Sequence, residues 1–566
     1  MTLNTTTPTT LLPPWLLPSS LSSLPLTTPA LILTLLVLYI SSLAVNRLFL
    51  SPLSSVPGPR LAALTWLYEF YYDIILGGQY VFKTIDLHKK YGPVVRINPY
   101  EVHIGDAEFY SVLYPTTTNK RRDRWAFYAR QFGAPGSGVG TVDHNLHRIR
   151  RSAINPFFSA QSVRKLQPVI TERVDALLRR LHADALGPDR QKPINILYPL
   201  SAMTNDIINE YAFARCDHLV EDPSYGASVT DYLLTGTHYG KLMQHASFML
   251  AVVNALPDAV SSALVPGWKG FLRMKRDIYA QIGEIQATQN TEKWQLDVPH
   301  ATIFHDLLSS KLLPPPEKST RRLAEEGQVL VQAGTLTSSW ALTLATFHLL
   351  DQPLLLRRLR DELCAAIPDP SDDPGSFDLP RLEALPLLRA IVKETLRHDI
   401  GAAGRSPRTI PSVRENGGEE VVYIDRETGK EYRFSPGTVV SMTAYKTLTD
   451  PDIFEDPFAF RPDRWLDGDE GKIQFLERHL TVVFGGGARA CLGMWLAQAE
   501  IFLTLAKVWR VWGGGGGDGD RREGDVGFMR LYETTARDVR MAADFFIPIP
   551  WRGTKGVRVV LESYGE

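Results

Sequence analysis

One cysteine stands where its surroundings suit chemistry. Cys491 closes the glycine-rich stretch Phe484-Gly-Gly-Gly-Ala-Arg-Ala-Cys-Leu-Gly493. Glycine lets the backbone adopt positive φ and approach a flat ligand closely. The apolar run from Leu492 to Val508 predicts a buried helix, which would place Cys491 at or just before a helix N-terminus, where the helix dipole and free N–H groups favour a thiolate. Taken alone, such a cysteine is a nucleophile or simply a buried apolar side chain.

The residues around Cys491 narrow this choice. The pattern Phe484-x-x-Gly487-x-Arg489-x-Cys491-x-Gly493 resembles, at every fixed position, the haem-binding signature of cytochromes P450. The resemblance implies that Cys491 is the proximal thiolate ligand of haem b. It also implies that Phe484 packs against the haem near the sulfur and that Arg489 pairs with a propionate.

A glutamate and an arginine 97 and 94 residues before Cys491 extend the resemblance. Glu394 and Arg397 match a Glu-x-x-Arg motif, which by itself usually marks a surface ion pair one helical turn long. In the family, this pair and an arginine farther along the chain form a buried network behind the haem. We expect Arg464 to be that third member, with Arg461 as the other candidate.

The propionates of a haem need further cations. Residues 144–158 resemble the family's C-helix, where many members carry Trp-x-x-x-Arg, and here His147 and Arg151 occupy those two positions. They are four residues apart and so face one side of a helix, although a solvated basic face is the alternative. Arg408, eleven residues after Arg397, resembles the propionate arginine that follows the K-helix.

A long predicted helix, from about residue 318 to 350, resembles the oxygen-binding helix of the family. Ala333, Gly334 and Thr337 match the motif in which a small pair opens the helix over iron and a threonine relays protons to dioxygen. The acid that precedes this threonine in the family is replaced by Leu336, which cannot carry protons. A glycine inside a helix costs about 1 kcal/mol relative to alanine, and a close contact between two helices is the other reason for Gly334.

The scaffold predicted for these residues is mostly helical. Helical patterns cover residues 160–186, 199–214, 266–291, 320–350, 353–366 and 385–397. Residues 94–97 and 100–105 flank an Asn-Pro turn and predict a β-hairpin. The expected fold class is therefore mainly α with small β-sheets, the cytochrome P450 fold, preceded by one transmembrane helix.

Composition excludes several classes of protein. A chain that is 44% apolar and 10% aromatic is not a disordered protein. Its 61 basic and 62 acidic residues create no overall field that favours nucleic acid. Three widely separated cysteines exclude a disulfide scaffold and suit a reducing compartment.

The N-terminal segment predicts a membrane anchor. Residues 1–46 contain no Asp, Glu, Lys or Arg. We divide the chain into a flexible lumenal tail (1–29), a transmembrane anchor (30–50), a Pro-rich hinge (51–60) that lets the body tilt, and a catalytic domain (61–566). About 20 residues at ~1.5 Å per residue cross a bilayer, whereas a cleaved signal peptide would require a basic start that this chain lacks.

Topology and location follow from the same segment. Arg47 and Arg60 follow the apolar span and nothing basic precedes it, so the body should be cytoplasmic. The expected location is a single pass through the endoplasmic reticulum membrane. Asn4 lies in an Asn-x-Thr sequon on the lumenal side and provides a test of this topology.

The resemblance implies a haem-thiolate monooxygenase that hydroxylates or epoxidises an apolar small molecule with O2. Electrons would come from NADPH–cytochrome P450 reductase, with cytochrome b5 as a second candidate donor, because the chain carries no dinucleotide-binding motif. We expect a monomer. Residues 531–548 resemble the C-terminal hairpin of fungal secondary-metabolite P450s of the trichodiene-oxygenase-like group, which act on terpenoid or polyketide intermediates. Residues 116–140 and 211–250 occupy the family's substrate-contacting segments.

Two other functions stay open at this point. Because Leu336 replaces the acid, a haem enzyme that catalyses rearrangement, dehydration or oxidative coupling is the alternative. A hydrolase with Cys491 as nucleophile is the hypothesis from outside haem chemistry. It predicts a colourless protein and leaves the joint presence of Arg489, Arg397 and Glu394 without a reason.

Overall fold

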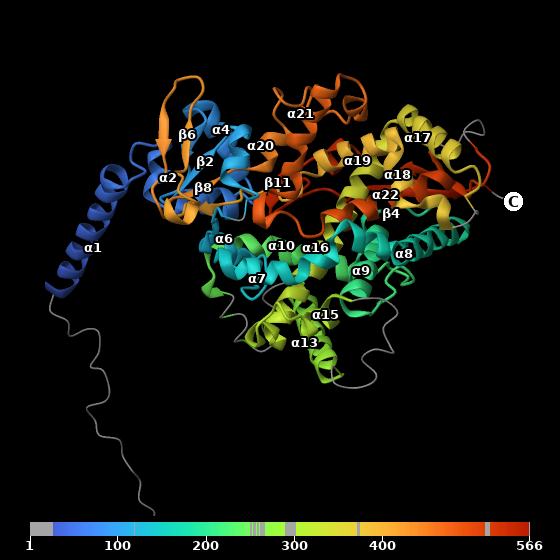
Figure 1. Cartoon of the computed structure of the whole chain (residues 1–566), viewed down its shortest axis with the longest axis horizontal. Helices are drawn as coiled ribbons and strands as arrows, with labels where there is room; N and C mark the ends of the chain where they lie inside the picture. The colour runs from blue at the N-terminus through green and yellow to red at the C-terminus, as the bar shows by residue number, and fades with distance from the viewer. Residues whose placement is uncertain are drawn as a thin grey trace, which may run out of the picture.

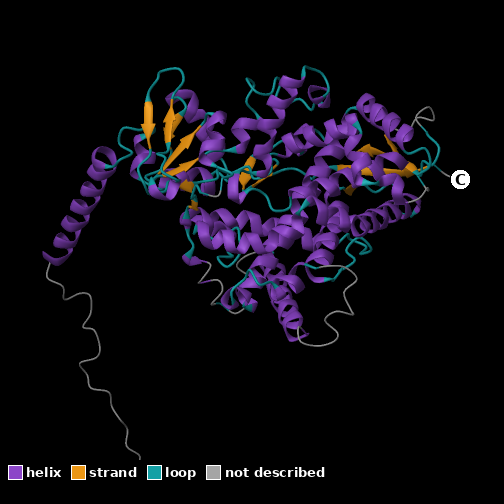
Figure 2. Ribbon diagram, viewed as in Figure 1, coloured by secondary structure: helices purple, strands orange, loops and turns teal. Residues whose placement is uncertain are grey.

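The longest helix, α16 (Thr320–Asp351), runs through the middle of the molecule and is the element around which the others assemble (Figure 1). Four helices pack against it: α9 (Leu197–Phe213), α13 (Trp268–Thr288), α19 (Pro386–Asp399) and α22 (Met494–Val511). Most side chains of α16 beyond its middle are buried, as expected of a helix that is apolar on nearly all sides. The architecture is mainly α with small β-sheets, which confirms the expected fold class (Figure 2).

The computed structural model describes residues 27–564 apart from 118, 189, 250–251, 253–255, 257–259, 261–266, 289–301, 371–373 and 515–520. Most of the predicted lumenal tail, with the sequon at Asn4, lies outside these described residues. The end of the predicted helix 266–291 and the later part of the glycine-rich insert near residue 515 lie outside them as well.

The six helices predicted from the sequence all form. Besides α9, α13, α16 and α19, they are α8 (Ala160–Leu186) and α17 (Pro353–Ala366). Polar caps define where helices begin: the Ser159 hydroxyl accepts the N–H of Ser162 at the start of α8, and the Asp143 carboxylate accepts the N–H of Leu146 at the start of α7 (His144–Ile154). The other α-helices of the body are α2 (Arg60–Leu64), α3 (Leu67–Phe70), α4 (Tyr80–Tyr91), α5 (Tyr110–Leu113), α6 (Ala126–Ala129), α10 (Ala227–His245), α15 (Ile303–Ser309), α18 (Leu379–Ala384), α20 (Ala444–Leu448) and α21 (Glu470–Leu480).

Most strands lie toward the two ends of the molecule, and the pair that contains β11 (Ala543–Phe545) lies near its middle (Figures 1 and 2). A five-stranded sheet has the order β1 (Val94–Arg96), β2 (Glu101–Ile104), β8 (Val439–Ser441), β5 (Arg408–Thr409) and β3 (Asp123–Arg124). The predicted hairpin is the antiparallel pair β1–β2, with Val94 opposite Ile104. The remaining sheets are β4 (Ile194–Asn195), β13 (Arg558–Ser563), β10 (Gly527–Leu531) and β9 (Trp512–Gly514); β11 (Ala543–Phe545) and β12 (Ile547–Ile549); and β6 (Val422–Ile424) and β7 (Glu431–Arg433).

The hydrophobic core has two main parts. The larger lies among α8, α9, α16, α19 and α22 and contains the fully buried indole of Trp509. The smaller lies under the five-stranded sheet and includes Val94, Val102 and Val440. The two parts flank the glycine-rich loop and hold the elements that carry the site.

The N-terminal apolar helix projects away from the body (Figure 1). It consists of α1 (Thr27–Val45) and the helical turn η3 (Asn46–Leu50), and residues Thr28–Leu50 are long and apolar enough to cross a membrane, with none of that span buried in the protein. Its end is tied to the body: Arg47 donates hydrogen bonds to the Leu64 carbonyl and to the Tyr100 hydroxyl, and Arg96 donates to the Arg47 carbonyl at 2.7 Å. These hydrogen bonds bridge the expected hinge at 51–60, which stays a prediction.

Candidate functional site

The loop that carries Cys491 folds back on itself. Two short 3-10 turns, η12 (Thr481–Phe484) and η13 (Gly487–Arg489), precede Cys491, and the Cys491 N–H donates back to the Phe484 carbonyl at 2.6 Å. Gly487 has φ +67°, and a Cβ there would lie 2.6 Å from the backbone oxygen of Pro115. Only glycine fits this conformation and this space, so the signature glycine shapes the loop.

The Cys491 thiol is exposed, although protein surrounds it on most sides. Desolvation by this surrounding protein raises the pKa of the thiol, and the Gly493 N–H and the charge of Arg151 only partly oppose that effect. Cys491 lies just before the N-terminus of α22, which begins at Met494, and the Gly493 N–H there lowers the pKa as expected, but desolvation outweighs it. The protein alone does not hold Cys491 as a thiolate, whereas a bond to a metal ion would deprotonate it.

A buried cluster of cationic side chains lies beside this loop. We call Arg124, Arg408, Arg489 and His147 the arginine cluster. The antiparallel register of β3 and β5 places Arg124 directly opposite Arg408, and both side chains are buried. Like charges opposite each other across two strands are destabilising. Burial, and then the charges of Arg124 and Arg408, lower the pKa of Arg489 to about 8.

Nothing in the described part of the chain neutralises the arginine cluster by an ion pair. Arg489 donates to the backbone carbonyls of Thr141 and Val142, and Arg408 to backbone and hydroxyl oxygens of residues 406–407. The Nε atoms of Arg124 and Arg489 and the Nδ1 atom of His147 are buried without a hydrogen-bond partner. Buried charges are normally paired, so the cluster fits a ligand with two carboxylates, as in haem b.

Gly493 supports the same fit. A Cβ at Gly493 would meet no protein atom within 4 Å, so the backbone next to Cys491 borders open space. The chain thus presents an accessible thiol, an uncovered stretch of backbone and a patch of unpaired cations close to one loop. A porphyrin with a metal ion and two propionates matches these three features.

The two predicted C-helix residues, His147 and Arg151, have different surroundings. His147 belongs to the arginine cluster, where burial and the charge of Arg489 hold its pKa far below the usual value. Arg151 instead donates to the side chain of Asn155 and, at 3.4 Å, to the Cys491 carbonyl. We predicted the two as a pair, and the structure brings only His147 to the cluster, because Arg151 lies one turn farther along α7.

Sequence reasoning missed Arg124. It lies in a strand of two residues, and no pattern in the sequence distinguishes it from its neighbours Arg121 and Arg122. Those two are satisfied by protein groups: Arg121 pairs with Asp123 and Glu415, and Arg122 donates to backbone carbonyls and to Asn416. Only the sheet register identifies Arg124, by placing it opposite Arg408.

The predicted oxygen-binding part of α16 shows one accessible face. Ala333 is exposed and Thr337 half-buried, on a helix that is otherwise largely buried, and the Thr337 hydroxyl donates to the Ala333 carbonyl at 2.8 Å. Gly334 faces α9 instead of the accessible face, because a Cβ there would lie 2.7 Å from Cγ1 of Ile208 in α9. Its role as an opening over iron is therefore corrected to a close helix contact. Leu336 is buried in the core.

A buried acid that we did not predict lies against α16. Glu500 of α22 is 1% exposed, and a hydrogen bond joins it to Ser338, the residue after Thr337. Burial raises the pKa of Glu500 to about 8. An acid nine residues after Cys491, in an otherwise apolar helix, was the signal available in the sequence.

The structure brings Glu394, Arg397 and Arg464 together in one network. Glu394 Oε1 lies 2.7 Å from Arg397 Nη2 and 3.2 Å from Arg464 Nε, and its Oε2 accepts the indole N–H of Trp465 at 2.9 Å. The other candidate, Arg461, contacts Glu394 only through its backbone N–H. Burial alone would raise the pKa of Glu394, but Arg397 and further hydrogen bonds outweigh it and hold the pKa well below its usual range.

Comparison with known proteins places this geometry in a family. The family model described as Cytochrome P450 matches residues 57–511. The chain is 41% identical over 534 residues to a cytochrome P450 monooxygenase, tpcC, of Cochliobolus heterostrophus, covering 94% of this chain and 97% of the relative. It is 38% identical to astB, a cytochrome P450 monooxygenase of Talaromyces wortmannii (94% and 98%), and to an N-acetyltryptophan 6-hydroxylase, ivoC, of Emericella nidulans (95% and 98%).

Proposed function

Because the chain belongs to the cytochrome P450 family, we propose that it is a membrane-anchored monooxygenase that hydroxylates or epoxidises an apolar secondary-metabolite intermediate. Membership gives the enzyme class, a P450 monooxygenase, and haem b as the cofactor. When bound, the haem supplies activated oxygen, so that one atom of O2 enters the product and the other leaves as water. The observation that carries the proposal is the unneutralised arginine cluster beside an accessible Cys491.

Each member of the site then has a task in holding the cofactor. The Cys491 thiolate would be the ligand to iron, and its bond to the metal would offset the cost of deprotonating a thiol whose pKa is raised. Arg124, Arg408 and Arg489 would bind the propionates by charge-assisted hydrogen bonds. His147 would donate to the same carboxylates as a neutral ring. Arg151 would stabilise the sulfur through the Cys491 carbonyl and its own positive charge.

Protons for oxygen activation would come through α16 and its neighbour. The Thr337 hydroxyl is accessible and bonded to the Ala333 carbonyl, so it can orient a water molecule. Leu336 supplies no proton. Glu500 is protonated at neutral pH because burial raises its pKa to about 8, and its hydrogen bond to Ser338 places it beside the same turn of α16. We infer that Glu500 takes the role of the missing acid.

Leu336 also favours the second candidate, a rearrangement, dehydration or oxidative coupling that needs no usual proton relay. Leu336 carries no proton and is buried in the core, away from the accessible face of α16 at Ala333 and Thr337. The two candidates differ in their need for O2 and electrons. Conversion of an oxygenated substrate under argon, without reductase, would establish the second, whereas strict dependence on O2 and NADPH supports the monooxygenase.

Several surface features support membrane anchoring with the body on the cytoplasmic side. The apolar span Thr28–Leu50 carries Arg47 near its end. Exposed apolar side chains continue from it along the first elements of the body, at Leu61, Leu67 and Ile75. A monomer anchored in the endoplasmic reticulum membrane would receive electrons from NADPH–cytochrome P450 reductase, or from cytochrome b5, at the Cys491 side.

A cavity of about 510 Å³ supports the apolar nature of the substrate. Its lining includes Trp66, Tyr100, Trp125 and Phe127. Tyr100 also contacts Arg47 at the end of the anchor, so the cavity lies beside the membrane-proximal part of the chain. The proposed substrate is a terpenoid or polyketide intermediate that partitions into the membrane. Accumulation of one such compound after deletion of the gene would identify it.

The decisive test concerns Cys491. Full-length protein, reduced and treated with carbon monoxide, should show the absorption band of thiolate-ligated haem, and Cys491→Ala should lose both this band and turnover. Cys364→Ala, in α17, is the matched control and should retain both. A Cys491→Ala variant that keeps the band would refute the ligand assignment, and a colourless wild-type protein would refute the cofactor assignment.

A further inference from the structure

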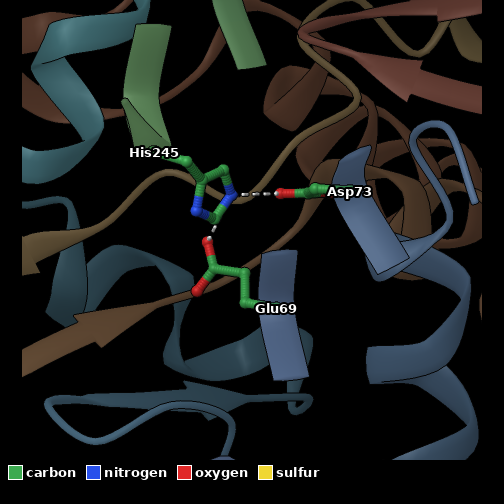
Figure 3. Close-up of side chains that lie close together, drawn as sticks. All are labelled: Glu69, Asp73 and His245. Carbon is green, nitrogen blue, oxygen red and sulfur yellow. Dashed lines mark ion pairs between the residues drawn. The ribbon is translucent and has the colours of Figure 1, made fainter. Parts of the chain in front are cut away.

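Three buried side chains converge at the end of α10, away from Cys491. Glu69 comes from α3, Asp73 from the helical turn η4 (Tyr71–Ile75), and His245 is the last residue of α10 (Figure 3). His245 Nε2 lies 3.6 Å from Asp73 Oδ2 and 3.8 Å from Glu69 Oε1. Their side chains are at most 4% exposed. We call these three residues the acidic triad.

Two members of the acidic triad have facing atoms without hydrogen bonds, whereas Glu69 Oε1 already accepts from Arg405 and Gln244. Both carboxylate oxygens of Asp73 and the Nε2 atom of His245 are buried without a hydrogen-bond partner. A separation of 3.6 Å is too long for a direct hydrogen bond between them. Lys241 does not close the gap, because its Nζ lies 3.6 Å from Asp73 and bonds to Asp544 at 2.9 Å instead.

Around the acidic triad, buried carboxylates outnumber buried cations. Ion pairs join four buried carboxylates to two permanent cations: Glu69, Asp73, Glu101 and Asp544 with Lys241 and Arg405. When all six are ionised, the four carboxylates and the two permanent cations carry an excess of two negative charges. Burial raises the pKa of Glu101, yet one excess charge remains when that carboxyl is protonated. A divalent cation would neutralise the ionised group.

The spacing and the atom types fit a metal ion. Zinc binds imidazole nitrogen and carboxylate oxygen at about 2.0–2.2 Å, which in a tetrahedron separates neighbouring ligand atoms by roughly 3.3–3.6 Å. The ligand atoms of the triad all lie within 4.8 Å of one another, and no other group of three or more His, Cys, Asp or Glu does so in the described part of the chain. His245 also lines the cavity of about 510 Å³, which gives an ion a way in and leaves room for a water ligand.

We propose that Glu69, Asp73 and His245 bind one divalent cation with the preferences of Zn²⁺. The ion ties the end of α10 to α3 and η4, the elements that follow the membrane anchor. It is a structural site, because no reacting group lies among its ligands. It stands apart from the haem ligand Cys491 and leaves the proposed oxygenation chemistry unchanged.

Zinc content tests the site directly. Full-length, haem-loaded protein in detergent is stripped with a chelator, incubated with ZnCl2 and desalted, and zinc and iron are then measured by mass spectrometry. We expect one zinc per haem iron in the wild type, and at least a tenfold loss of zinc in Asp73→Asn and His245→Asn. His238→Asn is the matched control: this exposed histidine lies on the same helix and should leave the zinc content unchanged.

A second measurement keeps the test decisive if a variant fails to fold. Zinc-edge X-ray absorption of the wild type should show only nitrogen and oxygen ligands at about 2.0–2.1 Å, including imidazole, and no sulfur near 2.3 Å. The proposal is overturned if the wild type retains no zinc, if folded His245→Asn retains as much as wild type, or if sulfur from Cys216 or Cys364 is a ligand. The carbon monoxide band monitors haem loading separately, so loss of the zinc site is distinguishable from loss of the enzyme.

Discussion

Two buried clusters of arginines in this protein differ in one respect. In the network around Glu394, a carboxylate lies between Arg397 and Arg464, and both of its oxygens accept hydrogen bonds. In the arginine cluster, Arg124 and Arg408 face each other across two strands, and no described carboxylate forms an ion pair with either. The first cluster contains an anion supplied by the protein, although Arg464 Nη2 is buried without a hydrogen-bond partner, and the second cluster contains none.

This difference separates a cluster that supports the fold from a cluster that binds a ligand. Desolvated charges cost free energy unless they are paired, so removing the shared anion of the first cluster should destabilise the fold, whereas the second cluster requires a ligand of opposite charge. The acidic triad is a third case, incomplete with the opposite sign. Variants of the network around Glu394 should therefore affect folding. Variants of the arginine cluster and of the acidic triad should affect ligand binding.

The largest effect is expected from Glu394→Ala. Removing the shared carboxylate leaves Arg397 and Arg464 buried without their anion, which should lower the free energy of unfolding by roughly 3–5 kcal/mol. Urea unfolding of the full-length protein measures this loss, and little haem-loaded protein should be recovered. Arg461→Ala is the control, because its side chain pairs only with exposed Glu455 and Asp456. A shift below about 0.5 kcal/mol is expected there.

Arg124→Gln should have the next largest effect, and it should act on haem rather than on folding. Loss of one charge-assisted hydrogen bond to a propionate corresponds to about 1.5–3 kcal/mol, or roughly a ten- to hundredfold faster loss of haem. Transfer of haem to excess apomyoglobin measures this rate. The free energy of unfolding of the haem-free chain should hold or rise, because repulsion with Arg408 is relieved.

Arg121→Gln is the matched control for that prediction. It lies three residues earlier and pairs with acidic side chains at the surface. Its haem transfer rate should equal that of the wild type. Equal rates in Arg124→Gln and wild type would show that Arg124 does not contact the cofactor and would remove the contrast between the two clusters.

The sequence predicted the network around Glu394 better than the arginine cluster. Glu394, Arg397 and Arg464 belong to motifs with fixed spacing, and α19 brings the first two together by its own periodicity. Arg124 has no such motif. Its position depends on pairing between a strand of two residues and another strand more than 280 residues away, which no local pattern encodes.

Contacts between helices could also not be predicted from the sequence at three positions. Long amphipathic or buried helices such as α8 and α16 follow from periodicity, and their bounds agree closely with the prediction. The direction of one side chain within a fully buried helix cannot be predicted from periodicity, since every face of such a helix is apolar. For this reason Gly334 was assigned to the wrong surface, the burial of Leu336 was missed, and Glu500 was overlooked.

Glu500 predicts a pH dependence of stability. The folded protein keeps its proton up to about pH 8, whereas the unfolded carboxyl ionises near its ordinary value of 4.5. Between these values the folded state binds more protons, so the free energy of unfolding should fall as pH rises, by up to about 1.4 kcal/mol per unit, and level off above pH 8. Glu500→Gln should flatten this slope and, if Glu500 supplies protons, increase hydrogen peroxide released per NADPH.

Asp399 provides the control, since burial also raises its pKa, to about 7. Asp399→Asn should remove its own share of the slope without changing peroxide release. Leu336→Glu is the less informative variant, because it would place a charge in the core and unfold the protein for that reason alone. Unchanged peroxide release in Glu500→Gln would exclude it from proton delivery.

The smallest effect separates two glycines that the family motifs treat alike. A methyl group at Gly334 meets Ile208 at 2.7 Å, so Gly334→Ala should cost about 1 kcal/mol of stability after the gain in helix propensity, with haem retention unchanged. Gly493→Ala meets no protein atom, so it should spare the haem-free fold and lower haem content instead. Gly283→Ala in α13, also without neighbours within 4 Å, should be neutral or stabilising. Thermal unfolding and the iron-to-protein ratio measure both quantities. A haem defect in Gly334→Ala would return this glycine to the cofactor side and contradict the assignment made from its contact with α9.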